Sequence, residues 1–464
     1  MPEQGFRSGS IEQLISTGRA MKTKQKLLLI YPGDFYSRDW GRFITLKPHM
    51  VYIYTFLKEF FDVSVVDLEN EFLRPEDEKG LEAFKEKSLN RILSIDTDYI
   101  AISCWSSLNF LSSLYFARKI KQKKPDTTII VGGYHPTLVP EDFKFENSPF
   151  DHVIKGEIHN ILKVFDLDTA LEKNTYEIFP DYISYPYYHS QKTIGMFLGS
   201  GCPFHCRYCM EYKKRWSSLS VKTAIDYIVK INEQISPRYI PIFDACFGFD
   251  KNWRKEFLKE LIKKDLDLYF WLETRVDLLD EEDIKLLSKL KIKIDFGIDS
   301  LSKTMLRIMR KTISPESFLE NFLNISKLCS EYGILHDMFM IFNHPGETQK
   351  TYEEFKSFFT DQVSPNLLGG YLRIKYQRFA YYPGSYIYNH QNEFQEQYGF
   401  KVLHPQWWKE SADQYSNSRD IIPSIDEKGV QYYVPLKETS KMIKGFNHYS
   451  KEQALWERMH SFNI

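Results

Sequence analysis

Short apolar runs alternate with helix-length amphipathic stretches along most of the 464-residue chain, and this alternation constrains the fold more than any other feature. Strands of a parallel sheet are buried on both faces and read as continuous apolar runs, and a helix must carry the chain from each strand to the next. The alternation therefore predicts an α/β protein. It is interrupted at residues 168–191, where prolines and tyrosines lie among acidic residues, so we expect a linker between two domains there.

The amino-terminal domain is predicted over residues 25–167, after a polar leader at residues 1–24. Apolar runs near 26–31, 63–68, 99–103, 128–133 and 152–155 alternate with helical stretches near 50–61 and 111–123. This pattern is typical of an open, doubly wound (Rossmann-like) sheet, whose ligand binds outside the carboxyl ends of the strands. Glycine-rich fingerprints for phosphate binding are absent. The residues at those strand ends are Tyr31, Pro32, Gly33, Ser103, Trp105, Gly132, Gly133, Tyr134, His135 and Glu157.

The second domain is predicted over residues 192–388, with six strands and intervening helices. Its strands are expected at 194–198, 239–243, 268–272, 292–298, 336–342 and 368–376, and its clearest helices at 221–234, 281–290, 315–332 and 352–360. Six such units predict a partial (β/α)6 TIM-type barrel with its chemistry at the carboxyl-terminal face of the strands. Residues 389–464 show weak periodicity, and we expect a carboxy-terminal extension that caps the substrate site.

Composition and charge exclude several classes of function. The net charge is −1, from 61 basic and 62 acidic residues, so no overall field attracts nucleic acid or an anionic membrane. The first twenty residues lack the apolar core of a secretory signal, and no window is long and apolar enough to span a membrane. We therefore expect a cytoplasmic protein with reduced thiols and with no nucleic-acid or membrane partner.

Cys202, Cys206 and Cys209 form a compact group of potential metal ligands just after the first barrel strand. Three thiolates are too few for a closed four-thiolate site, so the group indicates a metal or cluster with one open coordination position. The alternatives are an iron–sulfur cluster, a zinc site completed by His205 or a distant residue, and an accidental group of buried cysteines. The other cysteines, Cys104, Cys246 and Cys329, are scattered without a partner at metal-ligand spacing, which also disfavours a disulfide framework.

Together these motifs make residues 25–386 resemble the radical S-adenosylmethionine (SAM) enzymes, in the subgroup with an amino-terminal cobalamin-binding domain. The resemblance implies that Cys202, Cys206 and Cys209 bind three irons of a [4Fe–4S] cluster, and that SAM chelates the fourth iron. An electron from the cluster would then cleave SAM to methionine and a 5′-deoxyadenosyl radical. An external electron donor such as a flavodoxin or ferredoxin would reduce the cluster. No cysteine follows Cys329, which excludes an auxiliary cluster in the carboxy-terminal region.

The same resemblance implies a set of SAM-binding residues at the ends of successive barrel strands. Tyr208 would lie near the adenine, Arg275 would pair with the SAM carboxylate, and Asp299 would reach a ribose hydroxyl. Each has another reading, since Arg275 could pair with Asp277 or Glu273, and Asp299 could begin a helix. Asp244 stands where the family often has two acidic residues, with Ala245 in place of the second. The full set is Tyr208, Asp244, Glu273, Arg275, Asp299 and Pro345, the last in a turn expected against the adenine.

Cobalamin would lie between the amino-terminal sheet and the barrel, against the strand ends given above. The resemblance implies that the Gly132-Gly133 turn lets the backbone approach the nucleotide tail of the cofactor. A cobalt-ligating Asp-x-His-x-x-Gly motif is missing. His49 and His135 are therefore interpreted as turn or packing residues, with cobalt ligation as the alternative.

We expect a cobalamin-dependent methyltransferase that acts on an unactivated carbon of a specialised metabolite or peptide; no catalytic side chain is identified. One alternative is another radical SAM reaction, namely rearrangement, epimerisation, cyclisation or oxidation, with cobalamin as a redox cofactor or absent. The other is a sensor or zinc-stabilised binding module without activity. The substrate pocket is expected at the barrel mouth and the residues 381–384, Trp407 and Trp408, although these aromatics could equally be packing residues.

Overall fold

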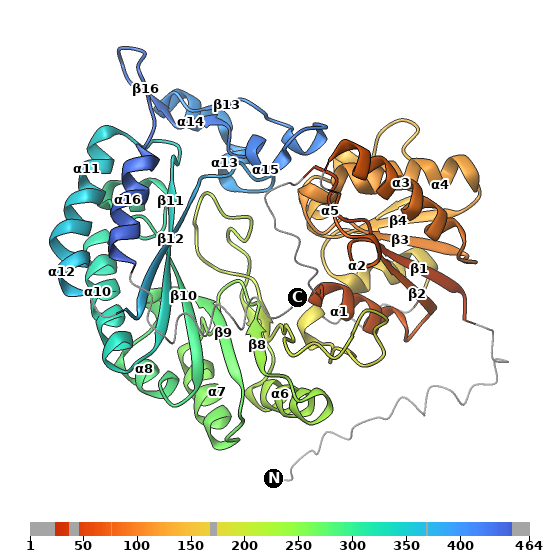
Figure 1. Ribbon diagram of the computed structural model, residues 1–464, viewed down its shortest axis with the longest axis horizontal. Helices are drawn as coiled ribbons and strands as arrows, with labels where there is room; N and C mark the ends of the chain where they lie inside the picture. The colour runs from red at the N-terminus through yellow and green to blue at the C-terminus, as the bar shows by residue number, and fades with distance from the viewer. Residues whose placement is uncertain (1–23, 37–45, 76, 168–173, 368–369, 448–464) are drawn as a thin grey trace, which may run out of the picture.

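A computed structural model describes residues 24–36, 46–75, 77–167, 174–367 and 370–447. The amino-terminal domain is built on a parallel sheet whose strand order is β2-β1-β3-β4-β5. This order reverses direction between β1 and β3, as in doubly wound folds, and it confirms the predicted architecture (Figure 1). The strands are β1 (Lys26–Tyr31), β2 (Asp62–Asp67), β3 (Tyr99–Ser103), β4 (Thr128–Gly132) and β5 (His152–Val153).

Helices pack on both faces of this sheet. The sequence analysis did not predict α3, because only Leu81, Phe84, Ser88 and Ile92 are buried in a helix that is otherwise charged. Asp77 begins α3 by accepting a hydrogen bond from the Gly80 amide. The helices are α1 (Pro48–Leu57), α2 (Leu68–Phe72), α3 (Glu78–Leu93), α4 (Phe110–Lys123) and α5 (Tyr134–Leu138).

The second domain is a curved parallel sheet in the order β12-β11-β10-β9-β8, with helices along its outer face (Figure 1). The predicted first strand at 194–198 is not a regular strand. It pairs with β8 through isolated bridges at Thr193 and Met196, and so occupies the sixth position of a partial barrel. Gly195 lies between those bridges, where an added Cβ would come within 2.5 Å of Phe243 and 2.6 Å of Pro48. The regular strands are β8 (Tyr239–Ile242), β9 (Tyr269–Thr274), β10 (Lys291–Asp299), β11 (Leu335–Phe342) and β12 (Leu372–Arg378).

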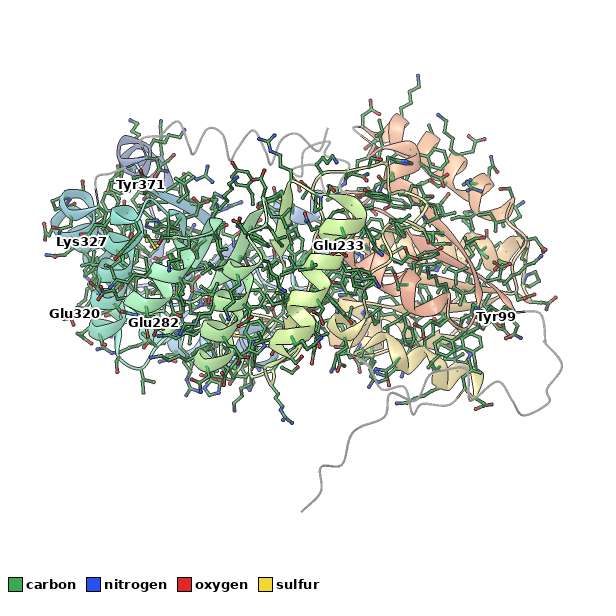
Figure 2. All side chains as sticks on the ribbon, turned by 90° about the horizontal axis from the view of Figure 1, so that it is seen from below. Tyr99, Glu233, Glu282, Glu320, Lys327 and Tyr371 are labelled. Carbon is green, nitrogen blue, oxygen red and sulfur yellow. The ribbon has the colours of Figure 1, made fainter. Side chains whose placement is uncertain are left out.

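The outer helices bury one apolar face against the barrel and present charged residues to solvent. Figure 2 shows Glu233, Glu282 and Glu320 on three different helices of this outer layer. The sequence analysis did not predict α7, a lysine-rich helix that buries Phe257, Leu258 and Leu261. The helices are α6 (Val221–Ile235), α7 (Lys251–Lys263), α8 (Glu281–Leu287), α9 (Lys303–Ile308), α10 (Pro315–Glu331), α11 (Gln349–Phe358) and α12 (Ser364–Asn366).

The carboxy-terminal extension contacts both domains. Trp407 and Trp408 are each 1% exposed and belong to the core of the amino-terminal domain, so they are packing residues and not pocket walls. Beyond them, α16 (Leu436–Phe446) returns to the barrel, where Thr439 hydrogen-bonds Tyr352 at 2.9 Å. The other elements are α13 (Tyr386–Asn389), α14 (Gln391–Tyr398), β13 (Lys401–Val402), α15 (Gln414–Asn417), β14 (Ile421–Ile422), β15 (Ser424–Ile425) and β16 (Gln431–Tyr432).

The segment between the domains is ordered and partly buried over residues 174–191; the rest of the predicted linker, 168–173, lies outside the described residues. Tyr182 and Tyr185 are 1% and 2% exposed and join the largest apolar core, which runs from the amino-terminal sheet into the barrel. The two domains therefore share one core at their junction. Among the described helices, none has both the length and the apolar character needed to cross a bilayer.

Candidate functional site

The cysteine triplet lies in a loop that a small antiparallel ladder closes at its base. β6 (Gly199–Ser200) pairs with β7 (Ser217–Ser218), and the loop between them carries Cys202, Cys206 and Cys209. Gly201 has a φ of 78°, and a Cβ there would come within 2.2 Å of the Arg215 carbonyl oxygen. Only glycine allows the two arms to approach this closely.

Each of the three sulfurs has at least one hydrogen-bond donor. The Glu211 amide donates to Cys209 Sγ at 3.3 Å, and Arg275 Nη1 donates to Cys206 Sγ at 3.7 Å. The Cys246 thiol hydrogen-bonds Cys202 and lowers the pKa of the Cys202 thiol. Donors of this kind stabilise thiolates and tune the clusters they hold.

Cys246 has no partner at metal-ligand spacing in the sequence, and the structure adds a contact with Cys202 that the spacing did not predict. Cys246 follows β8 and is 2% exposed, and only the parallel arrangement of the strands brings it beside the cysteine loop. A separation of 44 residues between Cys202 and Cys246 carries no local pattern that could reveal this contact.

The arrangement does not suit a single zinc ion. No three His, Cys, Asp or Glu side chains among the described residues are grouped to hold one metal ion together. His205, the proposed fourth zinc ligand, is exposed and packs toward Tyr212, with ring centroids 5.8 Å apart. A [4Fe–4S] cluster places a different demand on its ligands, because each cysteine binds a different iron. Three separated thiols with individual donors fit that demand.

Tyr208, Asp299 and Lys311 form a connected group beside the cysteine loop. Tyr208 donates to Asp299 Oδ2 at 2.5 Å, and Lys311 Nζ lies 2.7 Å from the same oxygen. Asp299 ends β10 with a φ of 68°, a strained value for a residue other than glycine. It does not begin α9, whose first turn is capped by Ser302 instead, so the helix-capping alternative is wrong.

Arg275 is held by several groups at once. Its guanidinium pairs with both oxygens of Asp277, at 2.9 and 2.7 Å, donates to the Lys311 carbonyl at 2.8 Å, and lies 3.8 Å from the centroid of the Phe204 ring. The pairing with Asp277 that the sequence left open is thus present. It coexists with the contact to Cys206, so Arg275 links the end of β9 to the cysteine loop.

Asp244 provides a test of whether the site suits SAM. Its Oδ1 accepts hydrogen bonds from the Leu198 and Gly199 amides, at 2.8 and 3.0 Å. Its Oδ2 is buried and has no partner among the described residues, and burial raises the pKa of the carboxyl to about 7. A buried carboxylate oxygen without a donor suits the amino group of a ligand such as SAM.

The turn that contains Pro345 packs next to Tyr208. The His344 ring meets the Tyr208 ring edge-on, with centroids 5.9 Å apart, and Pro345 is buried. Gly346 has a φ of 87° and would place a Cβ 3.1 Å from Tyr398. The structure therefore brings together the residues near which the adenine was predicted to lie.

A cavity of about 700 Å³ separates the amino-terminal sheet from the cysteine loop. Of the predicted ligand-binding residues, six line it: Ser103, Trp105, Gly132, Gly133, Tyr134 and Glu157. From the other side the cysteine loop contributes Glu211, Lys214 and Arg215. The floor is apolar, with Leu29, Ala101 and Ile130, and the rim carries hydroxyl and amide groups. Such a cavity suits a large, amide-rich ligand such as cobalamin.

Two contacts at this cavity refine the sequence analysis. Tyr134 donates to Glu211 at 2.6 Å, so the amino-terminal sheet is hydrogen-bonded to the cysteine loop, a link that sequence did not reveal. Gly133 has a φ of 125°, and a Cβ there would lie 2.4 Å from the Cys104 carbonyl oxygen. Glycine is therefore required at position 133 because the ends of β3 and β4 lie so close together. This requirement comes from packing within the domain and does not depend on a bound cofactor.

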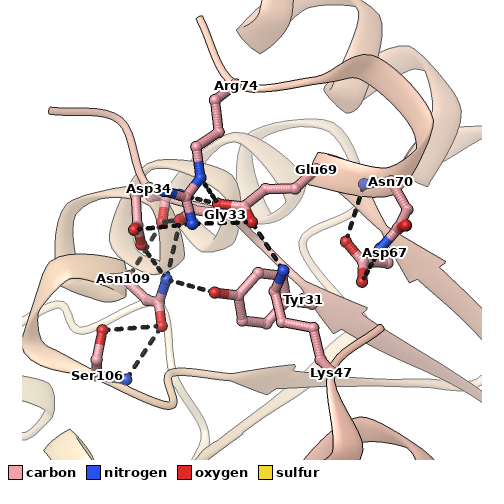
Figure 3. Close-up of polar contacts among 11 residues, drawn as sticks. Tyr31, Gly33, Asp34, Lys47, Asp67, Glu69, Asn70, Arg74, Ser106 and Asn109 are labelled. Atoms are coloured by element: carbon pink, nitrogen blue, oxygen red, sulfur yellow. Dashed lines mark hydrogen bonds and ion pairs between the residues drawn. The ribbon is translucent and has the colours of Figure 1, made fainter. Parts of the chain in front are cut away.

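Of the ten residues predicted at the strand ends of the amino-terminal sheet, four do not line the cavity: Tyr31, Pro32, Gly33 and His135. Figure 3 shows why the end of β1 does not reach the cavity. Asn109 binds the Gly33 carbonyl and Tyr31, and Glu69 packs so closely that a Cβ on Gly33 would lie 2.9 Å from Glu69 Cγ. The end of β1 is covered by the domain's own side chains.

The two histidines differ in their surroundings. His135 is fully buried and hydrogen-bonds Ser107 at 2.8 Å and Asp142 at 3.2 Å, which makes it a packing residue. His49 lines the cavity and stacks on Trp105 at a centroid distance of 4.0 Å. Burial lowers the pKa of His49 to about 3, so its ring is neutral.

Comparison with protein families identifies both domains. The model of the radical SAM superfamily matches residues 196–359, and the model of the B12 binding domain matches residues 46–165. The chain is a radical SAM enzyme with an amino-terminal B12-binding domain. Its cofactors are therefore SAM, a [4Fe–4S] cluster and cobalamin, as the sequence analysis predicted.

Two curated relatives of this radical SAM enzyme are distant. An uncharacterized methyltransferase, PH0819 of Pyrococcus horikoshii, is 23% identical over 342 residues, 66% of this chain and 71% of the relative. The anaerobic magnesium-protoporphyrin IX monomethyl ester cyclase of Rubrivivax gelatinosus is 23% identical over 278 residues, 50% of this chain and 49% of the relative.

Solved structures share the fold of the enzyme. The radical SAM methyltransferase TsrM from Kitasatospora setae, with cobalamin and a [4Fe–4S] cluster bound, superposes with a TM-score of 0.62 at 14% identity over 91% of each chain. The cobalamin-dependent radical enzyme OxsB superposes with a TM-score of 0.56 at 16% identity, over 81% of this chain and 56% of OxsB.

Proposed function

We propose that this enzyme is a methyltransferase that acts on an unactivated carbon of a specialised metabolite or peptide. One observation carries the proposal: a single cavity has the B12-binding sheet on one wall and the cysteine loop on the other. The cavity reaches Gly201, next to Cys202, and Ala245, next to Asp244, so a group held in it lies beside the proposed cluster and SAM site. Transfer of a methyl group needs this proximity, because the donor and the activated carbon must meet.

The side chains of the enzyme hold and orient its cofactors. Cys202, Cys206 and Cys209 would bind the cluster, Asp244 Oδ2 would take the SAM amino group, and Tyr208 would lie near the adenine. When bound, the cluster supplies the electron that cleaves SAM, and cobalamin supplies a carrier for the methyl group. The Tyr134–Glu211 hydrogen bond keeps the two binding sites in a fixed relation.

The relatives support methylation without deciding it. PH0819 and TsrM are named as methyltransferases, whereas the Rubrivivax relative is named as a cyclase. A rearranging, cyclising or oxidising reaction is therefore the competing outcome. For either reaction we propose that an external flavodoxin or ferredoxin supplies the electrons.

The test is a reaction with trideuteromethyl-labelled SAM after anaerobic reconstitution of the full chain. Candidate substrates are amino acids, together with peptides and metabolites from neighbouring genes. A product that gains one labelled methyl group supports the proposal. Release of 5′-deoxyadenosine with a dehydrogenated or rearranged product contradicts it.

Matched cysteine variants check that the reaction depends on the cluster. Cys206→Ala removes a cluster ligand, and we expect loss of iron content and of SAM cleavage. Cys329→Ala alters another buried thiol, on the outer helix α10, and should leave both unchanged. A Cys206→Ala variant that still cleaved SAM would refute the cluster assignment.

A further inference from the structure

The interior of the barrel is lined by alternate residues of its strands. On β9, Phe270, Leu272 and Thr274 are buried toward the helices, so Trp271 and Glu273 face the interior. A layer of apolar residues closes the interior at the amino-terminal ends of the strands, where Tyr239 and Leu335 pack with Tyr269, Trp271 and Tyr371. Interior residues further along these strands therefore lie toward the carboxyl-terminal end of the barrel, on the side of the cysteine loop.

Above this floor the barrel contains a buried charge network. Lys293 pairs with Asp295 at 2.5 Å and with Asp337 at 2.8 Å. Arg373 and Lys375 pair with Asp337 as well, at 2.7 and 2.5 Å. These five residues, which we term the lumen network, bind one another.

Glu273 lies in the same row as this network but is not part of it. The strand register aligns Glu273 with Asp295, Asp337 and Arg373 on successive strands. The Glu273 carboxylate nevertheless forms no hydrogen bond and no ion pair with any residue that the structure describes. Its side chain points into the open interior, where solvent reaches it although the strands enclose it on several sides. Burial among the surrounding strands, followed by repulsion from Asp295, raises the pKa of Glu273 to about 7.

The charged form of Glu273 is unfavourable in this position unless a ligand provides a cation or a hydrogen-bond donor. Partial desolvation and a neighbouring acid both disfavour the charged form, and no neighbouring cation compensates by direct contact. Lys293 and Lys375, the nearest lysines, are already paired with Asp295 and Asp337. The fold itself provides no structural partner for Glu273 among the described residues.

Two aromatic side chains, Phe243 and Trp271, lie close to the position of Glu273. Phe243 follows β8, which pairs with β9, and is 42% exposed. Its ring meets the Trp271 ring at a centroid distance of 5.7 Å, and Phe243 also lines the interdomain cavity. A carboxylate beside aromatic rings is the combination that binds an organic ammonium group, by ion pairing and cation–π attraction.

We propose that Glu273 binds a cationic amine of the substrate, with Phe243 and Trp271 contacting the carbon body next to that amine. This inference rests on the proposed function and narrows its substrate class to amine-bearing molecules. The position suits the reaction, because Arg275, two residues further along, reaches the cluster ligand Cys206. The part of the substrate that contacts Phe243 would face the cavity proposed for cobalamin.

The test uses 2-phenylethylammonium and its neutral isostere 2-phenylethanol as probes for the full chain, reconstituted with its cofactors. We expect calorimetry to show binding of the ammonium probe at least about tenfold tighter than that of the alcohol. Glu273→Gln should abolish this preference, and Glu273→Asp should restore part of it. Glu353→Gln, on the exposed side of α11, is the matched control and should keep the preference.

Two outcomes overturn the proposal. One is a wild-type protein that binds both probes equally or not at all. The other is a Glu273→Gln protein whose affinity for SAM falls as much as its affinity for the ammonium probe, since Glu273 would then serve SAM. Iron content and far-UV circular dichroism confirm that each variant is folded. Because the readout is binding, the result is independent of whether the enzyme methylates its substrate.

Discussion

Two buried charge networks in the described part of the chain differ in one respect. In the amino-terminal domain, Glu69 pairs with Lys47 at 2.9 Å and with Arg74 at 2.7 Å, and Arg74 lies 3.6 Å from Asp34 (Figure 3). We call this the β1 network, since it covers the end of β1. In the barrel, the lumen network pairs its cations as fully, yet Glu273 stands beside it without a partner among the described residues.

This difference separates structural charges from a charge available to a ligand. Removing one charge of a buried pair destabilises the folded state, because its partner is left buried without a counter-charge. A charge that the fold does not pair does not stabilise the folded state and is available to a ligand. The paired charges of both networks and the unpaired Glu273 therefore predict opposite patterns of stability and binding.

The largest effect is expected for Asp337→Asn, which removes the carboxylate shared by Lys293, Arg373 and Lys375. Three cations would lose an anion in a desolvated interior, at a cost of about 3–5 kcal/mol in unfolding free energy. Chemical denaturation with a barrel-specific probe measures this. Asp226→Asn, in an exposed pair with Lys222, is the control and should cost less than about 1 kcal/mol. Similar losses for both variants would show that the lumen network is not structural.

A smaller loss is expected for Glu69→Gln in the β1 network. Lys47 and Arg74 lose their main partner, but Asp34 remains within the network, so we expect a cost of about 2 kcal/mol. The loss should appear in unfolding of the amino-terminal domain, while iron content stays normal. A drop in iron content without a change in stability would mean that the network serves the cluster instead.

The β1 network also predicts a pH dependence. Burial and then the proximity of Glu69 raise the pKa of Asp34 to about 7, so the protonated carboxyl favours the folded state. This contribution is complete below the unfolded pKa of about 4 and is lost as the pH rises through about 7. Asp34→Asn should therefore flatten the decline of the melting temperature between about pH 4 and pH 7. An unchanged slope in differential scanning fluorimetry would assign the decline to other groups.

The smallest effect on stability is expected for Glu273→Gln. Because no described residue pairs with this carboxylate and its surroundings disfavour the charged form, its neutralisation should not lower the unfolding free energy and should raise it slightly above about pH 7. The same denaturation experiment as for Asp337→Asn measures it. A loss above about 2 kcal/mol would place Glu273 among the structural charges. It would then not differ from the paired charges of the two networks.

Sequence predicted the features that depend on local pattern. The parallel strands were found because both of their faces are buried, and the cysteine loop because its spacing is short. The helices α3 and α7 were missed because few of their residues are apolar. The contacts Cys202–Cys246 and Tyr134–Glu211 join distant segments, and only the folded chain reveals them.

The strand ends show a different limit of sequence reasoning. The rule that ligands bind at the carboxyl ends of strands applies to β3 and β4, whose ends line the cavity, but not to β1. The end of β1 is covered because Glu69 and Asn109, from other elements, fold over it. Likewise, the sequence places Glu273 in a recognisable motif, whereas only the folded structure shows that no described residue pairs with its carboxylate.

The two tryptophans of the carboxy-terminal extension bear on how the protein is made. Trp408 donates to Asp142, which precedes it by 266 residues, and both Trp407 and Trp408 fill the core around Phe110 and Phe143. During synthesis, the amino-terminal domain therefore emerges from the ribosome with an unfinished core and must wait for most of the chain to follow. We expect nascent chains to depend on chaperones until residue 408 has been translated.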